Sequence, residues 1–246
     1  MKKIISDKGG FWLGTTLAIG AIISTLIASG MVLEIKTSDR TISVKGYAVE
    51  PIVADLASWS GEFTARGANL KDLASLVDEQ KEIVAAYLKE SKINTGDTEW
   101  KSPEMSVLYK RNEKGNDTHD IESYKIKQRF IVQSRNVNLI SQLAEGAGKL
   151  LESGLEFNSH RPSFRFTKLE QWKLNMLEKA RTNARERAEI LVKGGGVKIG
   201  DVRSASQGIF QIKPWNDTSV SSYGTNDTTA ISKNICAVVT MEYAFE

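Results

Sequence analysis

The side chains that most often carry chemistry in proteins are sparse in this sequence, which holds two histidines and one cysteine. Neither His119 nor His160 has a cysteine or a pair of carboxylates nearby at the spacing of metal ligands. Cys236 stands alone in an apolar segment near the C-terminus, which is typical of a small buried side chain rather than a redox sensor. We therefore expect no metal, no cofactor and no catalytic residue.

Motifs for nucleophilic catalysis and nucleotide binding are missing as well. The sequence contains no Gly-x-Ser-x-Gly elbow, no Walker loop and no dinucleotide fingerprint. The triplet Gly194 to Gly196 follows a predicted helix rather than a strand, so it indicates a helix cap. Asp55, among apolar residues after Pro51, is either a site residue or an acceptor for backbone N–H groups at a bend, and we favour the structural role.

Composition and charge narrow the class of protein. The chain has 246 residues, of which 41% are hydrophobic and 26% charged, with four prolines. These values exclude a disordered tail, a collagen and a disulfide scaffold. Lys and Arg number 33 against 30 for Asp and Glu, a formal net charge of +3. Because so small and evenly spread a charge is not typical of a nucleic-acid footprint, we expect no nucleic-acid partner.

One apolar segment predicts the location of the protein. Residues Gly9 to Leu33 form an uncharged run that, as a helix, is long enough to cross roughly 30 Å of hydrocarbon. The sequence thus predicts a cytoplasmic tail over 1–8, a transmembrane anchor over 9–33 that binds the lipid bilayer, and an exported domain over 34–246. The alternative is a cleaved signal peptide, with small residues 28–30 at the cleavage site. We favour the anchor because the run exceeds the usual apolar region of about 7–15 residues.

Charges around this run predict its orientation. Lys2, Lys3 and Lys8 precede it, whereas the charges of residues 34–40 cancel one another. The positive-inside bias therefore keeps the N-terminus in the cytoplasm. We expect a single-pass protein of the bacterial inner membrane with its C-terminal domain in the periplasm.

Small residues recur every fourth position within the run, at Thr16, Gly20, Ser24 and Ala28. This spacing places them on one helical face, where a second helix can approach closely. The alternative is that small residues are simply common in membrane helices. These four residues are candidate contacts of a homo-oligomer.

The exported part predicts an α+β fold with antiparallel sheets and helices packed on one face. Alternating and three-to-four apolar spacings predict, in order, strands 41–49 (ended by Pro51) and 52–66, a helix 69–91, strands 99–110 and 121–134, a helix 137–151 and a strand 155–166. From residue 52 onward this order is β-α-β-β-α-β, the split pattern of a ferredoxin-like sandwich. The stretch from Arg111 to Asp117, which joins the two strands of the predicted hairpin, is expected in solvent.

A long helix and two more strands complete the prediction. The helix covers 167–193, and the strands cover 198–211 and 231–245. Its buried line is predicted to be Leu169, Trp172, Met176, Ala180, Ala184, Ala188 and Leu191. The polar connection between the strands carries Trp215 and Tyr223, and is either a flap or oligomer contact or a solvated hairpin loop.

Several of these segments resemble one family. They are the strand from Ile42 to Ala48 (ISVKGYA), the stretch from Ala54 to Trp59 (ADLASW), the helix with alanines at 180, 184 and 188 that closes on glycines before VKIGDV, and the final strand VVTMEY. Together they resemble the SIMPL-domain (DUF541) family over roughly residues 40–246, and an anchored subgroup of that family has a similar apolar span ahead of its first strand.

The resemblance implies exposure in the periplasm or at the cell surface and an α+β fold. By similarity to the family's periplasmic immunogenic member it also implies assembly into large rings, and some members are linked to oxidative-stress defence. The family has no established catalytic motif to transfer. We expect a membrane-anchored, non-enzymatic envelope protein that assembles with itself; the alternative is a periplasmic hydrolase or redox enzyme that uses isolated acids or Cys236.

Overall fold

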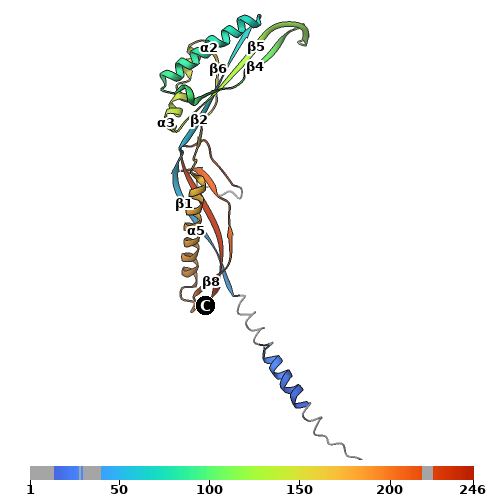
Figure 1. The fold of residues 1–246 in the computed structure, drawn as a ribbon, viewed down its shortest axis with the longest axis vertical. Coiled ribbons are helices and arrows are strands. Elements are labelled where there is room, and N and C mark those ends of the chain that lie inside the picture. Colours follow the sequence, from blue (N-terminus) through green and yellow to red (C-terminus); the bar gives the residue numbers. More distant parts are fainter. Residues whose placement is uncertain (1–13, 28, 30–39, 218–223) are drawn as a thin grey trace, which may run out of the picture. The chain divides into compact units, whose positions relative to one another are not determined.

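The computed structural model describes residues 14–27, 29, 40–217 and 224–246 (Figure 1). Residues 14–27 are helical. No helix among the described residues is long and apolar enough to cross a membrane. The spanning helix that the sequence predicts over 9–33 is thus not found, and part of that segment lies outside the described residues.

The chain divides into two compact units, whereas the sequence predicts one exported domain over 34–246. Unit 1 comprises Met1–Ala48, Leu177–Gly208 and Ala237–Glu246, and unit 2 comprises Val49–Met176 and Ile209–Cys236. The segments of the two units alternate along the sequence. Composition and spacing do not reveal such a division, because no linker-like stretch marks it.

Unit 2 is built on a six-stranded antiparallel sheet in the order β3-β5-β2-β6, with β4 paired to β5 and β7 paired to β2. The strands are β2 (Leu56–Gly67), β3 (Thr98–Trp100), β4 (Glu104–Arg111), β5 (Asp117–Ser134), β6 (Glu156–Ser159) and β7 (Ser163–Arg165). The alternating burial of β2 places Trp59 and Phe63 in the core, at 1% and 0% exposure. The antiparallel arrangement predicted from the sequence is confirmed, and the elements of this stretch follow in the order β2, α2, β3, β4, β5, α3, α4, β6 and β7.

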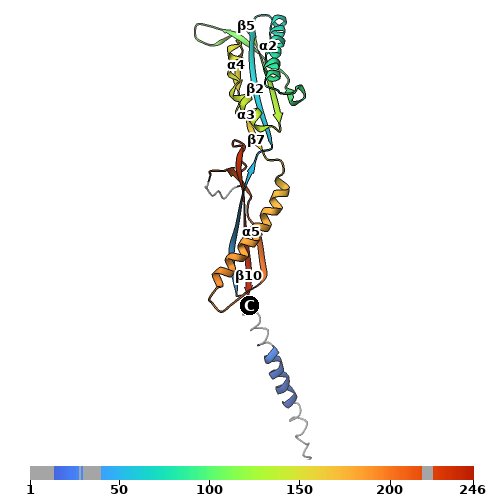
Figure 2. The same ribbon diagram turned by 90° about the vertical axis from the view of Figure 1, so that its left-hand side faces the viewer.

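Three helices and one short 3-10 turn cover the core side of this sheet. Helices α2 (Leu70–Glu90), α3 (Val137–Glu145) and α4 (Gly148–Glu152) run alongside β2 (Figure 2), and η1 is Thr95–Asp97. Asn69 caps α2 by accepting a hydrogen bond from the Lys71 N–H at 2.8 Å. The Tyr87 hydroxyl of α2 donates to the Leu143 carbonyl oxygen of α3 at 2.6 Å, so the two helices are neighbours on one face.

Several predicted elements are split in the structure. Predicted strand 99–110 is divided at 101–103, where Pro103 cannot donate to a sheet ladder. The predicted helix 137–151 is divided at Gly146, where a Cβ would lie 3.1 Å from the Tyr87 hydroxyl. Strand 155–166 is divided at 160–162. Each division falls on a residue whose backbone or packing stops the regular element.

The interruption predicted at Pro51 is wrong. Strand β1 runs through it, from Thr41 to Val53. In the order β1-β10-β8, β1 is an outer strand, and Pro51 is exposed, so its missing N–H takes no ladder bond from the sheet. The second predicted strand, 52–66, accordingly starts later, as β2 at Leu56.

In unit 1, helix α5 packs on a sheet of β1, β10 and β8. Helix α5 is Leu169–Val192, β8 is Ile199–Gln207 and β10 is Ser232–Phe245, with β8 antiparallel to the later part of β10. Strand β9 (Gln211–Pro214) pairs antiparallel with the first part of β10, and both of these segments belong to unit 2. Ala180, Ala184 and Ala188 are each 0% exposed. The predicted alanine line of α5 is therefore confirmed. Leu191, also predicted in that line, is 67% exposed because the helix ends where it leaves the sheet.

The glycine cap predicted after this helix is confirmed. Gly194 and Gly196 have φ of 91° and 72°, a region that favours glycine. Two polar contacts also join α5 to β1. The Tyr47 N–H donates to Oδ1 of Asn183 at 3.1 Å, and Nη1 of Arg187 donates to the Lys45 carbonyl oxygen at 3.1 Å.

Candidate functional site

The oligomer contacts predicted from the apolar run are only partly described. Thr16, Gly20 and Ser24 lie on the helical stretch at four-residue spacing, and all three are exposed. Ala28 lies outside the described residues, as does Tyr223 of the second predicted contact. The shared face predicted for Thr16, Gly20 and Ser24 stays a candidate surface.

Trp215, the other residue of that second contact, follows β9 in unit 2 and is 68% exposed. Its backbone is held on both sides: its N–H donates to the Ser232 carbonyl oxygen at 3.2 Å, and its carbonyl oxygen accepts from Nδ2 of Asn234 at 2.9 Å. An exposed indole on a fixed backbone loses little conformational entropy when a partner covers it. The predicted role of Trp215 as a contact residue stays a prediction.

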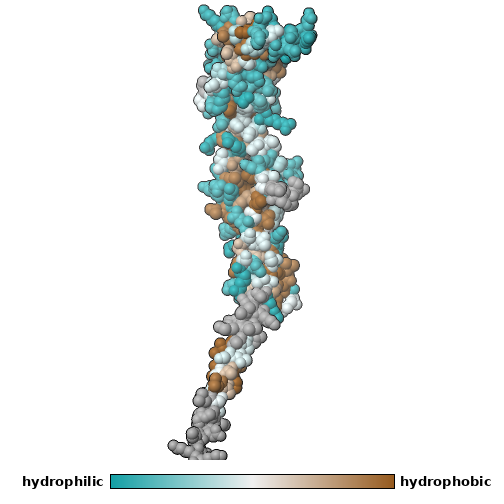
Figure 3. Space-filling model, turned by 90° about the vertical axis from the view of Figure 1, so that its right-hand side faces the viewer, coloured by the Kyte–Doolittle hydropathy of each residue, from teal (hydrophilic) through white to brown (hydrophobic). Residues whose placement is uncertain are grey.

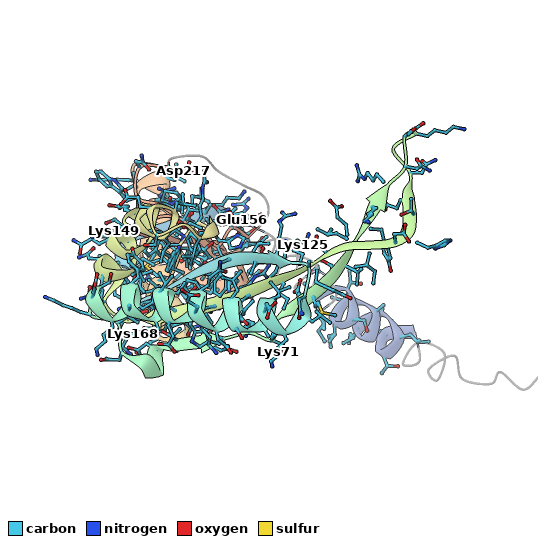
Figure 4. All side chains as sticks on the ribbon, turned by 90° about the horizontal axis from the view of Figure 1, so that it is seen from above. Lys71, Lys125, Lys149, Glu156, Lys168 and Asp217 are labelled. Atoms are coloured by element: carbon cyan, nitrogen blue, oxygen red, sulfur yellow. The ribbon has the colours of Figure 1, made fainter. Side chains whose placement is uncertain are left out.

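The β4–β5 hairpin forms an arm that extends from unit 2. Residues 124–134 of β5 pair with β2, but residues 117–123 pair only with β4 in the described part of the chain. Figure 4 shows the hairpin continuing past Lys125, away from the helices of unit 2. A two-stranded ribbon is marginally stable in water by itself, so the surface that this arm presents is informative.

One face of the arm is apolar. Directly opposed residues of an antiparallel pair share a face, and three such pairs are Met105 with Ile126, Val107 with Tyr124 and Tyr109 with Ile121. We call these six residues the arm stripe. Ile126 and Tyr124 pack against the core of unit 2, so the stripe continues the core face into solvent. Met105, Ile121 and Tyr109 are 57%, 48% and 42% exposed.

The tip of the arm is a fixed polar turn. Oδ1 of Asn112 accepts hydrogen bonds from the N–H groups of Lys114 and Asn116, both at 3.0 Å, and Gly115 has a φ of 79°. Residues 111–117 are exposed, as the sequence predicts. The turn therefore holds β4 and β5 in register and keeps the arm stripe on one face.

The opposite face of the same sheet carries ion pairs. Glu62, 8% exposed, accepts from Nζ of Lys127 at 3.1 Å and from Nη2 of Arg129 at 2.9 Å. Burial acts to raise the pKa of Glu62, but the hydrogen bonds from Arg129 and Lys127 outweigh it and lower the pKa. The polar and apolar surfaces of this sheet are thus on opposite faces, and the apolar one is exposed along the arm.

A polar recess lies at the other end of unit 2. It is lined by Ser141 and Glu145 of α3, by Ser159, His160 and Arg161 between β6 and β7, and by Thr229. The Ser141 hydroxyl donates to Oε1 of Glu145 at 3.0 Å. Nε2 of His160 is buried and has no hydrogen-bond partner among the described residues. An imidazole with an unpaired buried nitrogen is the strongest candidate for polar chemistry among these residues.

A buried lysine beside this recess was not predicted from the sequence. Lys233 of β10 is 1% exposed, and its Nζ donates to the Phe164 carbonyl oxygen at 2.9 Å, to Oδ2 of Asp227 at 3.0 Å and to the Asp227 carbonyl oxygen. Asp227 also accepts from the Thr229 hydroxyl at 2.7 Å and the Ala230 N–H at 3.0 Å. All three protons of the ammonium group are used, so this pair is a structural tie between β7, β10 and the 227–230 loop.

The electrostatics of Asp227 agree with a structural role. Burial acts to raise its pKa, but hydrogen bonds from Thr229, Ala230 and Lys233 outweigh burial and lower the pKa to about 2. The carboxylate is therefore held ionised and paired, whereas a catalytic acid or base near neutral pH needs a pKa closer to the operating pH.

Two further residues take the structural roles that the sequence favours. Oδ1 and Oδ2 of Asp55 accept hydrogen bonds from the Thr167 N–H at 2.7 Å and the Thr167 hydroxyl at 2.8 Å, beside the bend between β1 and β2. Cys236 is 6% exposed, within β10. His119, on the arm, is exposed. Among the described residues, no group of three or more His, Cys, Asp or Glu side chains is placed to hold a metal ion.

Comparison with known proteins identifies the family. The model of the SIMPL family, described as proteins of unknown function (DUF541), matches residues 42–243. The chain belongs to the SIMPL family. Among curated proteins, no relative matches it significantly. The matched residues take in both units of this SIMPL protein from the second residue of β1 to Tyr243 of β10.

The spacing of residues in the sequence indicates only part of the arm stripe and does not indicate the buried Lys233. Met105, Val107 and Tyr109 stand at every second position, which is the spacing of one strand face, but Leu108 between the last two breaks the alternation with polar residues. The register that sets them opposite Ile121 and Tyr124 depends on an irregularity between Leu108 and Tyr109, which spacing does not show. Lys233 carries no signal, since a single lysine in a strand is typical of a solvated edge.

Proposed function

We propose that this SIMPL protein is a membrane-anchored, non-enzymatic envelope protein whose exported part assembles with copies of itself into a homo-oligomer. The arm stripe of β4 and β5 is the main contact and Trp215 is a second one. A closed ring is the form we favour, because a head-to-tail contact repeated by a rotation closes on itself.

The observation that carries this proposal is the exposure of the arm stripe. Met105, Tyr109 and Ile121 each leave two fifths or more of their surface in water, on a ribbon that has no second layer over it in the described structure. Apolar patches of this kind, rimmed by polar residues, are typical of protein contacts. Strand β4 also has an open edge, since it pairs with β5 alone among the described strands, and natural proteins usually cover such an edge.

Anchoring favours the same assembly. The uncharged run of residues 9–33 and the lysines ahead of it support a single-pass anchor with the N-terminus in the cytoplasm and the rest in the periplasm. Copies confined to one membrane plane meet at a raised effective concentration, so weak contacts through the arm are strengthened. The small residues Thr16, Gly20, Ser24 and Ala28 add a helix–helix contact in this proposal.

One observation favours a second candidate, a periplasmic enzyme. The buried Nε2 of His160 has no hydrogen-bond partner among the described residues, and His160 lines a recess together with Ser141 and Glu145. The Ser141 hydroxyl, however, donates to Glu145 rather than to an imidazole, so no activated nucleophile is assembled. His160→Ala leaves assembly unchanged in our proposal, whereas loss of a hydrolase or redox activity in this variant would favour the enzyme.

The test is the mass of the full-length protein extracted in detergent, measured by light scattering. We expect a mass above that of the monomer, and we expect the double variant Met105→Glu/Ile121→Glu to lower it. The carboxylates would have to be buried in the contact without a partner, which is costly. Trp215→Ser is expected to lower the mass to a smaller extent.

The matched control is Ser106→Glu. Ser106 is exposed on the opposite face of β4, directly opposite Lys125, so an added carboxylate there changes charge but leaves the arm stripe intact. It should assemble like the unchanged protein. A monomeric full-length protein, or a stripe variant that assembles as well as the control, would contradict assembly through the arm.

A further inference from the structure

One end of unit 1 is where the chain enters from the apolar run. The Phe245 N–H, at the end of β10, donates to the Arg40 carbonyl oxygen at 3.2 Å, just before β1 begins. Lys198 and Glu246 exchange two backbone hydrogen bonds at 3.0 and 2.9 Å. The start of β1, the end of β10 and the start of β8 therefore meet at this end, and the turn from α5 into β8 lies there too.

This turn exposes apolar side chains. Ile190 and Leu191 on the last turn of α5 are 68% and 67% exposed, and Val197 after the glycines is 40% exposed. Lys193 and Lys198, both exposed, stand beside them in the sequence. We call these five residues the pole of unit 1. Figure 3 shows hydrophobic surface at this end of unit 1, below the more polar surface that follows it.

The pole does not belong to the packing of α5 on its sheet. The buried face of α5 ends at Ala188, and Ile190 and Leu191 point to other sides of the helix. A hollow beside them is lined by Val192, Gly194 and Gly196, and the two glycines contribute no side chain to it. In the described part of the chain, the pole is thus an apolar surface with basic residues, on which Ile190 and Leu191 are mostly exposed.

Chain length restricts what can cover this surface. Seven residues lie between Leu33, the end of the apolar run, and Thr41, the start of β1. A fully extended chain of that length spans at most about 25 Å. If residues 9–33 are anchored, the end of unit 1 that carries Arg40 is confined to the immediate vicinity of the lipid headgroups.

The charged residues at the pole also favour a location at the lipid headgroups. Lys193 and Lys198 flank the apolar residues, and Nε of Arg185 already pairs with the nearby Glu189 at 3.1 Å. Other acidic residues near this end are Glu246, whose side chain lies against Gly200, and Asp201, which is exposed on β8. Exposed Ile, Leu and Val side chains with lysines around them are the combination that binds at the boundary of headgroups and acyl chains.

We propose that the pole of unit 1 lies on the membrane surface, with Ile190, Leu191 and Val197 among the lipid headgroups and with Lys193 and Lys198 at the lipid phosphates. This inference rests on the anchoring proposed above and deepens it: the exported part is seated on the bilayer and not merely tethered to it. The occupant of the pole is phospholipid.

The experiment uses the full chain reconstituted into vesicles of phosphatidylcholine and phosphatidylglycerol. Leu191→Cys is labelled with an environment-sensitive fluorophore, and a nitroxide carried by the lipid headgroups serves as quencher. Leu174→Cys is the matched control, since Leu174 is on the same helix and is 72% exposed. Cys236 is buried, and the unsubstituted protein measures its background labelling.

We expect the label at 191 to be quenched on the order of twofold more than the label at 174, and exchange of Lys193 and Lys198 for glutamate to reduce the difference. Val197→Cys repeats the measurement if Leu191→Cys does not fold. Protein that floats with the vesicles but shows equal quenching at both positions would overturn the seating and leave the anchor intact.

Two other results would also overturn the proposal. A label at 191 that is blue-shifted but not quenched by the lipid nitroxide would mean that protein covers the pole. A chain that does not float with the vesicles would overturn the anchor and the seating together. Flotation and quenching are measured on the same sample, so failure of the anchor is distinguished from failure of the seating alone.

Discussion

Gly46 of β1 lies so close to α5 that no side chain fits between them. A Cβ placed on Gly46 would lie 2.0 Å from the Ala180 carbonyl oxygen and 2.7 Å from the Ala184 Cβ. The glycine and the alanines thus form one contact, in which the smallest side chains of the helix meet a residue with none. Close approach of this kind is a packing requirement for both partners.

Overpacking this contact should destabilise unit 1. Ala184→Leu adds three carbons at a position that is 0% exposed, so we expect the free energy of unfolding to fall by about 1–3 kcal/mol. Glu186→Leu, at an exposed position on the same helix, should change it little. Chemical denaturation of both variants measures the difference, and equal stability would mean that the helix adapts to the larger side chain.

Removing the Lys233 ammonium group should lower the free energy of unfolding more than overpacking at Ala184 does. Lys233→Met leaves the Asp227 carboxylate and the Phe164 carbonyl oxygen without their ammonium partner, and breaking a buried pair typically costs about 3–5 kcal/mol. Adding Asp227→Asn to Lys233→Met should recover part of the loss. The double-mutant cycle gives the coupling energy, and simple additivity of the two effects would contradict a direct interaction.

Stability should depend on pH through Asp227. Its pKa is about 2 in the folded protein against an ordinary value of 3.8. Because the folded pKa is the lower one, the pairing stabilises the fold above pH 3.8, by about 2 kcal/mol, and this contribution is lost as the pH falls towards 2. The difference in unfolding free energy between the unchanged protein and Asp227→Asn should shrink over that interval. A constant difference would show that Asp227 titrates normally.

If residues 9–33 are a membrane anchor, they should be retained in the mature protein. The intact mass of membrane-extracted protein should correspond to a chain that begins at or beside Met1. Cleavage near Met31 would identify residues 9–33 as a signal peptide instead.

The orientation is tested separately. Alkaline phosphatase fused after residue 246 should be active, because the enzyme matures only outside the cytoplasm. An inactive phosphatase together with an active cytoplasmic reporter at the same junction would reverse the predicted topology.

Local patterns in the sequence predict the secondary structure of this protein well and its surfaces poorly. The four-residue spacing of Ala180, Ala184 and Ala188 is enough to identify the buried side of α5, since few other patterns suit a helix that lies so close to a sheet. The prediction at Pro51 is wrong because a proline interrupts an inner strand but is tolerated in an outer one. Strand β1 is an outer strand because it pairs with β10, which is distant in the sequence.

The candidate contact surfaces depend on pairing between segments, which a single sequence does not specify. Tyr109 and Ile121 share the arm stripe only through the irregular register of β4 and β5. The partners of Lys233 include a backbone oxygen of Phe164, 69 positions away, and carbonyl oxygens are present at every residue. The sequence therefore could not show which of the 33 basic residues are buried, as Lys213 and Lys233 are in the described structure.

The order of segments in unit 1 has a consequence for how the protein is made. Its middle strand, β10, lies between β1 and β8 and follows every other described strand in the sequence. During synthesis, β1 and the alanine face of α5 are therefore complete long before the strand that joins them. This delay favours binding of a chaperone to the nascent chain, since early segments stay open to aggregation until β10 is available.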